Sequence, residues 1–324
     1  MIRFRDLASA AAELDPAVER VTAVGYFDGL HIGHQRLLAE LKDWALRIGA
    51  EPAIVTFDRH PQEVISGSTP LRILSVEHKL LLLERQGIRA TLVLPFTLEL
   101  SRWSPEEFVE RVIQDGMGAH HLLMGFDSAF GNRRRGTFEY LSARAGSLGI
   151  GVRQAGIESL DGERVSSTLV RTALRAADLP GLERLLGRRF SLLGRVVHGD
   201  GRGRSIGYPT ANLDSMGAAP PPPGVYFAEV EPIGWEGPRG GATRWGGLVN
   251  VGRRPTFGGD GEDTVEVHLL GLGLDRDIYG RLLEVHFLER HRDEKKFPSV
   301  VALVDQIKAD EAEFRRRHPG LHPG

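Results

Sequence analysis

No cysteine occurs in the 324-residue chain. Disulfide bonds, catalytic thiolates and zinc–thiolate centres are therefore excluded. The sequence also has no apolar run near the roughly 20 residues that span a bilayer. Residues 1–20 lack the uninterrupted apolar core of a signal peptide. From these absences we expect a cytoplasmic protein with no membrane partner.

Neither sign of charge dominates, because 41 Lys and Arg residues face 43 Asp and Glu residues and give a net charge of −2. This balance argues against a nucleic-acid partner, although a local basic cluster such as Arg133–Arg135 can still bind a single phosphate group. The hydrophobic share of 41% is ordinary for a chain that buries real cores. At roughly 150 residues per domain, the length predicts two domains. We expect the chain to act as a monomer or a weak homo-oligomer.

Short apolar runs alternate with helical patterns in the first half of the chain. The expected strands cover 21–27, 52–57, 90–95, 121–124 and 151–157, and the expected helices cover 35–48, 76–86, a segment that starts at Ser104 with a capping box, and 137–147. This alternation predicts an α/β doubly wound domain with a parallel sheet. Such sheets bind ligands beyond the carboxyl ends of their strands. A helical stretch over 168–186 closes the domain, which we place at residues 1–186.

The second half has a different pattern of expected elements, with short strands and few helices. Its expected strands cover 190–197, 225–230, 245–251, 265–270 and 282–287, and Gly- and Pro-rich segments separate them. This pattern predicts a small antiparallel β-barrel domain at residues 187–324. One amphipathic C-terminal helix over 299–317 is expected to pack against the barrel and close it.

A phosphate-handling turn is predicted where the first strand meets the first helix. The sequence there is GYFDGLHIGH, from Gly25 to His34. Glycines let the backbone turn sharply and approach a ligand, and a helix N-terminus attracts phosphate. His31 and His34 can donate hydrogen bonds that stabilise a transferring phosphate, so we take them as catalytic candidates. The candidate phosphate-binding residues of this turn are Gly25, Phe27, Gly29 and Gly33. Surface-loop histidines or metal ligands are the alternatives.

A second phosphate-binding element is predicted at the start of the helical stretch that ends the same half. The sequence SSTLVR covers Ser166 to Arg171. The hydroxyl groups of Ser167 and Thr168, the free N–H groups and Arg171 can together hold a triphosphate. The alternative is that Ser and Thr simply cap the helix.

These two elements, in this order, resemble those of the HxGH nucleotidylyltransferase superfamily, whose domains are Rossmann-like. Between them, TFDRHP (56–61) and GFDSAFGNRRRG (125–136) are similar to segments of bacterial FAD synthetases. The second segment carries Ser128 where the family has Phe. The resemblance implies transfer of a nucleotidyl group with release of pyrophosphate. It also implies that Asp127 and Phe130 bind the flavin.

A Gly-rich basic loop opens the second half, with the sequence GDGRGRSIGYPTAN over 199–212. Its backbone, with Gly203 and Arg204, can wrap phosphates, although it is not a Walker A loop. Thr210 and Asn212 lie two residues apart and point the same way from an extended segment. Both offer oxygen ligands that suit Mg²⁺. On physical grounds alone, such a loop is also compatible with a flexible turn.

This loop closely resembles the GRxxGxPTAN signature of riboflavin kinases. The segments from Asn250 to Phe257 and from Arg292 to Phe297 are similar to further kinase segments. The resemblance implies that Thr210 and Asn212 hold Mg-ATP, that Glu266 is the general base for the ribityl 5′-hydroxyl, and that Arg292 lies near the flavin. His268, on the same strand face as Glu266, is expected to be a bystander.

Together these motifs predict a member of the bacterial bifunctional riboflavin kinase/FMN adenylyltransferase (FAD synthetase) family. The implied substrates are riboflavin, FMN and ATP, with Mg²⁺ as cofactor, and the implied product is FAD. One alternative is an adenylyltransferase for another phosphate acceptor, fused to an inactive barrel. Others are a non-catalytic flavin sensor or a nucleic-acid-binding barrel. A further alternative is that one domain is inactive, and the altered Ser128–Ala129 positions make the adenylyl domain the better candidate.

Overall fold

The computed structural model describes residues 1–199, 203, 206–236, 244–256, 259–271 and 278–321. The chain divides into two compact units. The first unit comprises Met1–Leu71 and Lys79–Ser167, and the second comprises Arg72–His78 and Thr168–Gly324. Within the described ranges, no helix combines the length and the apolar character needed to cross a membrane.

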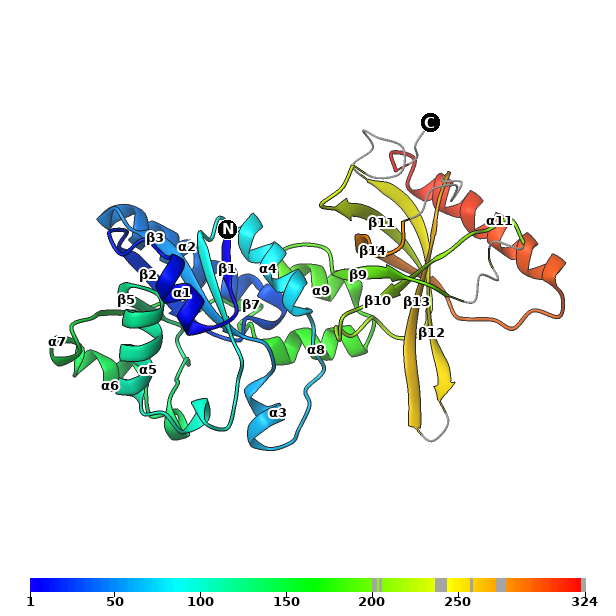
Figure 1. The fold of residues 1–324 in the computed structure, drawn as a ribbon. Helices are drawn as coiled ribbons and strands as arrows, with labels where there is room; N and C mark the ends of the chain where they lie inside the picture. The colour runs from blue at the N-terminus through cyan, green and yellow to red at the C-terminus, as the bar shows by residue number, and fades with distance from the viewer. Residues whose placement is uncertain (200–202, 204–205, 237–243, 257–258, 272–277, 322–324) are drawn as a thin grey trace. The chain divides into compact units, whose positions relative to one another are not determined.

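A six-stranded sheet forms the centre of the first unit (Figure 1). Its order is β1 (Ile2–Phe4), β4 (Ala90–Leu94), β3 (Glu51–Phe57), β2 (Arg20–Val24), β5 (Ala119–Met124) and β6 (Gly151–Gln154), and every pair is parallel. The predicted doubly wound α/β class is therefore confirmed. The strand order reverses between β2 and β5, which is where ligands bind in sheets of this type.

Helices connect these strands, as the alternating pattern predicted. They are α1 (Leu7–Glu13), α2 (Ile32–Ile48), α3 (Pro61–Ile65), α4 (Val76–Arg85), α5 (Pro105–Phe108) with a π-helical continuation (Val109–Gly116), α6 (Phe138–Ser142) and α7 (Ala145–Leu148). The capping box at Ser104 is confirmed, because its hydroxyl accepts from the N–H of Glu107 at 3.1 Å. The single helix predicted over 137–147 is wrong. The chain leaves helical geometry at Arg144 (φ −112°, ψ 2°), so two short helices form there.

A small two-stranded sheet and two helices follow along the chain. The strands are β7 (Ser159–Leu160) and β8 (Glu163–Arg164), and the helices are α8 (Ser167–Arg175) and α9 (Leu179–Leu186). The helical stretch predicted over 168–186 is interrupted because Asp178 caps a new helix, accepting from the N–H of Gly181 at 3.0 Å. Pro180 lies in the first turn of α9, where its missing N–H costs nothing.

The second unit contains a closed antiparallel barrel, which confirms the predicted class. Its strands in order are β10 (Ala211–Asp214), β13 (Gly259–Leu269), β12 (Trp245–Thr256), β11 (Gly224–Ile233), β14 (Leu282–Arg292) and β9 (Ser191–Val197). The sequence predicted five of these strands and missed β10, which pairs with β13 and β9 and completes the ring. Among the described residues, each strand of the barrel therefore pairs with a neighbour on both sides.

The C-terminal helix α11 (Val300–Arg317) packs on one face of the barrel, as predicted. Ser299 caps it by accepting from the N–H of Ala302 at 3.2 Å. Phe314 is fully buried, and its ring meets that of Phe227 edge-on at a centroid distance of 5.3 Å. Gly246 makes room for Phe314, because a Cβ at Gly246 would lie 2.5 Å from the ring.

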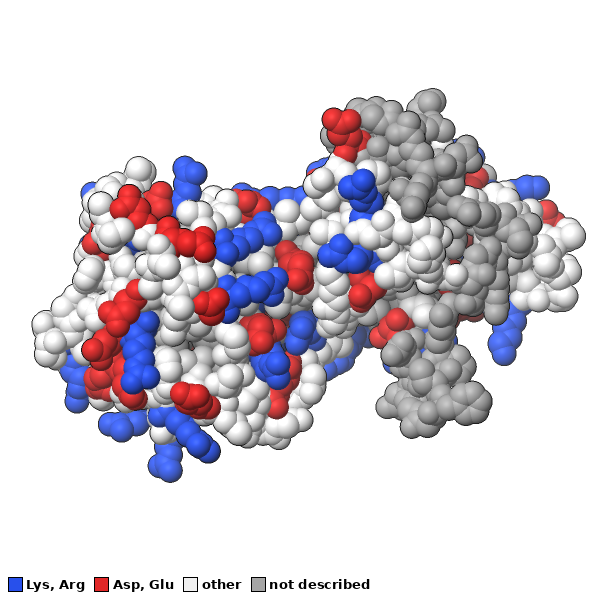
Figure 2. Space-filling model, viewed as in Figure 1, with Lys and Arg blue, Asp and Glu red and all other residues white. Residues whose placement is uncertain are grey.

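Charged side chains on the first unit pair locally. On the face seen in Figure 2, basic and acidic groups are interspersed rather than separated by sign. Arg36, for example, bridges Glu40 and Glu158, with N···O distances of 3.1 Å to each. Exposed pairs of this kind contribute about 0–1 kcal/mol each, so the buried cores dominate stability.

Replacing Phe314 by Ala is expected to lower the free energy of unfolding of the second unit by about 3–5 kcal/mol, because it leaves a cavity under α11. Val301→Ala on the same helix is the control, since Val301 is 69% exposed and its loss should change stability by less than about 0.5 kcal/mol. Urea unfolding followed by circular dichroism measures both changes. Equal effects of the two variants would show that Phe314 does not anchor the helix.

Candidate active sites

The turn after β2 adopts a strained backbone. Phe27 (φ 53°) and Leu30 (φ 43°) both have left-handed backbone angles, and Gly29 lies between them at φ 82°. A residue other than glycine in this region costs about 1–3 kcal/mol, and such strain persists only where the surroundings hold it. Gly29 can adopt its angle without that cost. The strained turn leads directly into the N-terminus of α2.

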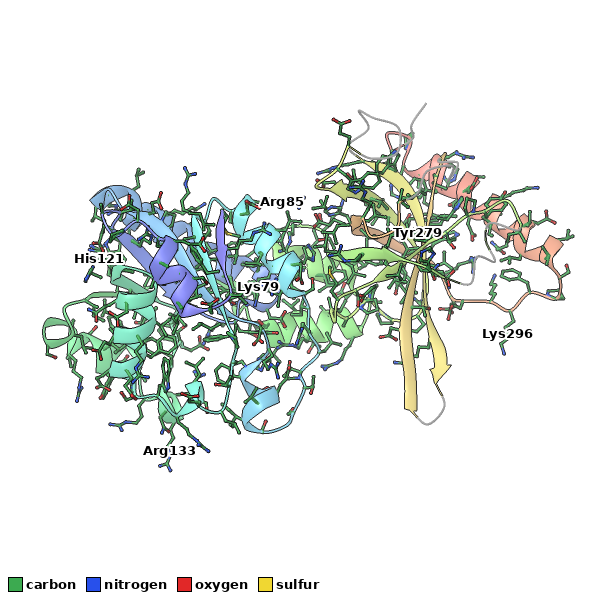
Figure 3. All side chains as sticks on the ribbon, in the orientation of Figure 1. Lys79, Arg85, His121, Arg133, Tyr279 and Lys296 are labelled. Atoms are coloured by element: carbon green, nitrogen blue, oxygen red, sulfur yellow. The ribbon has the colours of Figure 1, made fainter. Side chains whose placement is uncertain are left out.

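Three side chains donate hydrogen bonds to backbone carbonyl groups of every second residue in this turn. Lys79 Nζ donates to Tyr26 O, Ser167 Oγ to Asp28 O, and Gln35 Nε2 to Leu30 O, each at 2.9 Å. Lys79, which Figure 3 labels, also donates to Phe57 O at 3.0 Å and is buried. The ends of β2 and β3 are therefore tied together under the turn.

The two histidines of the HxGH element lie at the start of α2 with stacked rings. Their centroids are 3.7 Å apart and their planes differ by 18°. His31 caps the helix, because its Nδ1 accepts from the N–H of His34 at 3.4 Å. A neutral His31 then carries its proton on Nε2 and can donate from there. Gly33 permits this stacking, since a Cβ there would lie 3.2 Å from the His31 ring.

These groups line a cavity of about 210 Å³ at the carboxyl ends of the strands. The predicted residues in its wall are Gly25, Phe27, His31, Gly33, His34, Asp127 and Ser167. The wall also contains residues that the sequence did not single out, and these include Phe126, Ile157 and Arg164. Arg164 pairs with Asp127 at 2.5 Å and lies over the Phe126 ring. The sequence signal that could have identified Phe126 and Arg164 is their position close to Asp127 and Ser167 in the chain.

Other predicted residues lie elsewhere. Phe130 packs its ring on Phe108 at 4.6 Å in the hydrophobic core, outside the cavity wall. Gly29 belongs to the turn itself. Thr168 and Arg171 lie on α8 and belong to the second unit.

In the second unit, strand register brings three polar side chains into one row. Asn212 on β10 is opposite Glu266 on β13, which is opposite Asn250 on β12. Directly opposed residues point to the same face of a sheet. Val265 and Val267 are buried on the other face, as the alternation predicted. The row therefore faces the side of the barrel that α11 covers.

This row lines a cavity of about 530 Å³ between the barrel face and α11. Its wall contains five predicted residues: Gly203, Thr210, Asn212, Glu266 and Arg292. The hydroxyl, amide and carboxylate groups of Thr210, Asn212 and Glu266 are oxygen donors, which suit a hard divalent cation. Leu303, Ile307 and Asp310 of α11 complete the wall.

Glycines shape the loop beside this cavity. The carbonyl of Gly203 accepts from Tyr208 N at 2.9 Å, and a Cβ at Gly203 would lie 2.3 Å from Tyr208 O. A Cβ at Gly199 would lie 2.1 Å from Asn212 Nδ2, so only glycine lets this amide keep its position. Arg204, and Phe257 of the second kinase-like segment, lie outside the described residues.

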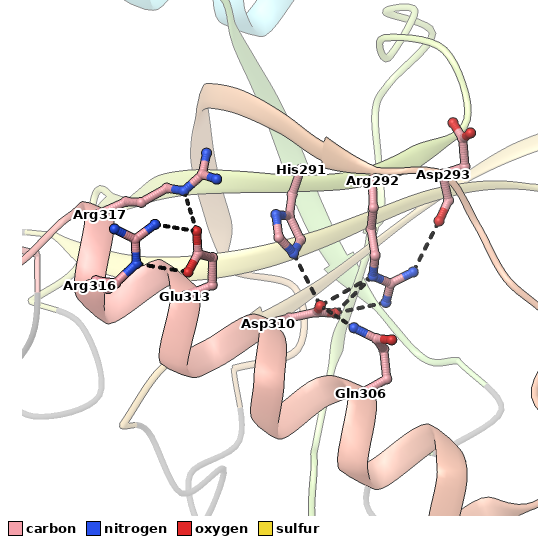
Figure 4. Close-up of polar contacts among 8 residues, drawn as sticks. All are labelled: His291, Arg292, Asp293, Gln306, Asp310, Glu313, Arg316 and Arg317. Atoms are coloured by element: carbon pink, nitrogen blue, oxygen red, sulfur yellow. Dashed lines mark hydrogen bonds and ion pairs between the residues drawn. The ribbon is translucent and has the colours of Figure 1, made fainter.

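Arg292 is fixed in the cavity wall by a buried carboxylate (Figure 4). Asp310 is 2% exposed and accepts from Arg292 Nη2 at 2.7 Å and Nε at 3.0 Å. It also accepts from Gln306 Nε2 at 2.8 Å and faces His291 Nε2 at 3.1 Å. His291 therefore helps to hold the same carboxylate, and its ring stacks on that of Phe227 at a centroid distance of 4.2 Å.

His268 bridges two walls of the cavity. Its Nδ1 lies 2.9 Å from Pro209 O, and its Nε2 lies 3.0 Å from Glu311 Oε1 on α11. The hydrogen bond from His268 lowers the pKa of Glu311 below its ordinary value. The contacts of His268, which was expected to be a bystander, connect the PTAN segment with the helix.

A parallel-sheet unit with stacked histidines, followed by a barrel with an Asn–Glu–Asn row, defines a two-site transferase. Family models for FAD synthetase and riboflavin kinase match residues 15–169 and 186–318. The bifunctional riboflavin kinase/FMN adenylyltransferase of Pseudomonas fluorescens is 40% identical over 91% of this chain and 92% of its own. The enzyme of the same description from Haemophilus influenzae is 34% identical over 89% and 90%. The chain belongs to the bifunctional riboflavin kinase/FMN adenylyltransferase family.

A solved structure extends the comparison to the whole fold. A protein from Streptococcus pneumoniae, described as a macrolide-efflux protein, has a TM-score of 0.78, with 31% identity over 97% of this chain and 99% of its own. That description applies to the other protein alone. Because both family models match, the alternative of another phosphate acceptor with an inactive barrel is not favoured.

Replacing Gly199 by Ala is expected to weaken ATP binding to the barrel about tenfold, or about 1.4 kcal/mol, because the new methyl group displaces the Asn212 amide. Calorimetric titration in magnesium-containing buffer measures the affinity. Gly320→Ala in the same unit is the matched control, since a Cβ there meets nothing within 4 Å. If both variants bind ATP as the wild type does, Asn212 does not need its observed position.

Proposed function

We propose that this chain makes FAD from riboflavin by two ATP-dependent transfers, one at each cavity. The barrel transfers the γ-phosphoryl group of ATP to riboflavin and forms FMN. The parallel-sheet unit transfers AMP from a second ATP to FMN and releases pyrophosphate. The observation that carries the proposal is that most of the described candidate residues line one of two cavities, one for each reaction.

In the kinase reaction, Glu266 acts as the general base. Its carboxylate takes the proton of the ribityl 5′-hydroxyl while that oxygen forms a bond to the γ-phosphorus. The bond from the γ-phosphorus to the bridging oxygen breaks, and ADP leaves. Thr210 and Asn212 would hold the cation of Mg-ATP, and Gly203 and Arg204 are the proposed phosphate-binding residues. Mg²⁺ bound there would neutralise charge on the phosphate oxygens.

In the adenylyl transfer, a phosphate oxygen of FMN forms a bond to the α-phosphorus of ATP. The bond to the α,β-bridging oxygen breaks, and pyrophosphate leaves with the electron pair. His31 and His34 donate hydrogen bonds to the oxygens that gain charge, and the N-terminus of α2 adds positive potential. Ser167, Thr168 and Arg171 hold the triphosphate. Positioning and electrostatics do most of this work, so no strong base is required.

Several finer assignments belong to the same proposal. Asp127 contacts the flavin of the adenylyl site, and Arg292 contacts that of the kinase site. The functional boundary lies at residues 186 and 187, where α9 ends and the riboflavin kinase match begins. We further infer that the enzyme is cytoplasmic, because both reactions consume ATP. We also infer a monomer or weak homo-oligomer that binds neither nucleic acid nor membrane.

Chromatography of the products tests the function directly. Riboflavin with ATP and Mg²⁺ is expected to give FMN and then FAD, and FMN as the starting flavin is expected to give FAD. FMN without FAD would overturn the second activity and direct attention to Ser128, which replaces the family's Phe in the adenylyl cavity. Folded protein that forms no flavin product would overturn both.

Two substitutions should separate the reactions. Glu266→Gln removes the base and is expected to slow FMN formation about 10²–10⁴-fold, while FAD still forms from supplied FMN. His31→Ala removes a donor from the adenylyl site and is expected to slow FAD formation about 10²–10³-fold, while FMN still forms. Initial rates from each starting flavin measure both effects.

A thermal melt beside the wild type is the control for correct folding of the unit that carries each substitution. Loss of both activities in one variant would point to unfolding of the whole chain. Near-normal riboflavin phosphorylation by folded Glu266→Gln would show that another group is the base.

A further inference from the structure

The peptide that carries Thr210 is held by a side chain that the kinase chemistry above does not use. His268 Nδ1 lies 2.9 Å from the carbonyl oxygen of Pro209, and that carbonyl belongs to the peptide bond that leads into Thr210. His268 lines the cavity on the same face of β13 as Glu266. The bond therefore fixes the backbone immediately before a proposed cation ligand.

The second ring nitrogen determines the charge of His268. A carbonyl oxygen only accepts, so Nδ1 must carry a proton. Nε2 lies 3.0 Å from a carboxylate oxygen of Glu311, which in its ionised form also only accepts. Both contacts are hydrogen bonds when the ring is an imidazolium. A neutral ring with its proton on Nδ1 would direct the lone pair of Nε2 at the carboxylate.

We propose that His268 is a positioning residue of the kinase site that links α11 to the PTAN segment and orients Thr210 for Mg-ATP. The proposal rests on the proposed riboflavin kinase function. His268 touches the peptide rather than the reacting atoms, so its effect falls on ATP binding more than on the chemical step.

Charged side chains surround the contact between His268 and Glu311. Glu311 is the nearest carboxylate, and Glu266 on the same strand and Asp310 on α11 line the same cavity. The opposing cations are Arg315, which lies 3.4 Å from the other oxygen of Glu311, and Arg292, which is paired with Asp310. Tyr208 meets the imidazole edge-on at 5.4 Å. His268 is 12% and Glu311 15% exposed, so water screens this pair only in part.

The positioning role has a defined kinetic signature. Because His268 holds the peptide that leads into Thr210, its loss is expected to raise the KM for ATP in riboflavin phosphorylation, with a smaller change in kcat.

Two replacements of His268 distinguish positioning from mere packing. The amide of Asn occupies the place of Nδ1 and can still donate to Pro209, whereas the amide of Gln occupies the place of Nε2 and cannot. His268→Gln is expected to raise the KM for ATP about tenfold, the effect of losing one hydrogen bond. His268→Asn is expected to recover most of that affinity.

His318→Gln is the matched control, since His318 lies 3.2 Å from Glu289 outside the cavity. It should leave the KM for ATP unchanged. A thermal melt beside the wild type reports on folding of the barrel in every variant. Equal KM values for ATP in His268→Gln and His268→Asn would overturn the inference. A wild-type protein that does not phosphorylate riboflavin would instead overturn the proposed function.

Discussion

The register of the strands is the constraint on which both cavities depend. Side chains alternate between the two faces of a strand, so a slip of one residue would turn a whole set of side chains to the other face. The pairing of β13 with β10 and β12 is what brings Glu266 between two amides. In the first unit, the parallel pairing of β2 with β3 brings two strand ends within reach of the single ammonium group of Lys79. The functional geometry is thus built into the backbone before any ligand arrives.

Much of the fold could be predicted because its signals are local. The alternating and helical periodicities identified the parallel sheet, most of the barrel and the last helix. The strand β10 escaped because its four residues continue a glycine-rich loop and gain their order from two distant partners. The break at Arg144 escaped because nothing in the apolar pattern of that segment marks it.

The site residues also divide into those that a local motif identifies and those whose roles depend on contacts with distant parts of the chain. The residues of the HxGH and PTAN segments could be named because their spacing carries a mechanism. His268 and Arg164 could not be assigned, because their roles depend on partners 43 and 37 residues away in the chain, Glu311 and Asp127. Phe130 is the opposite case, because this motif residue is partly buried and packs against the core, outside the cavity wall.

The contribution of α11 to the kinase cavity has a consequence for biosynthesis. Leu303, Ile307 and Asp310 form one wall, and Asp310 also fixes Arg292 on the last strand. The ribosome makes this helix after all six strands of the barrel, whereas every residue of the first unit has been made once Ser167 has emerged. During translation, the unit for the second reaction of the pathway can therefore fold before the site for the first reaction is complete.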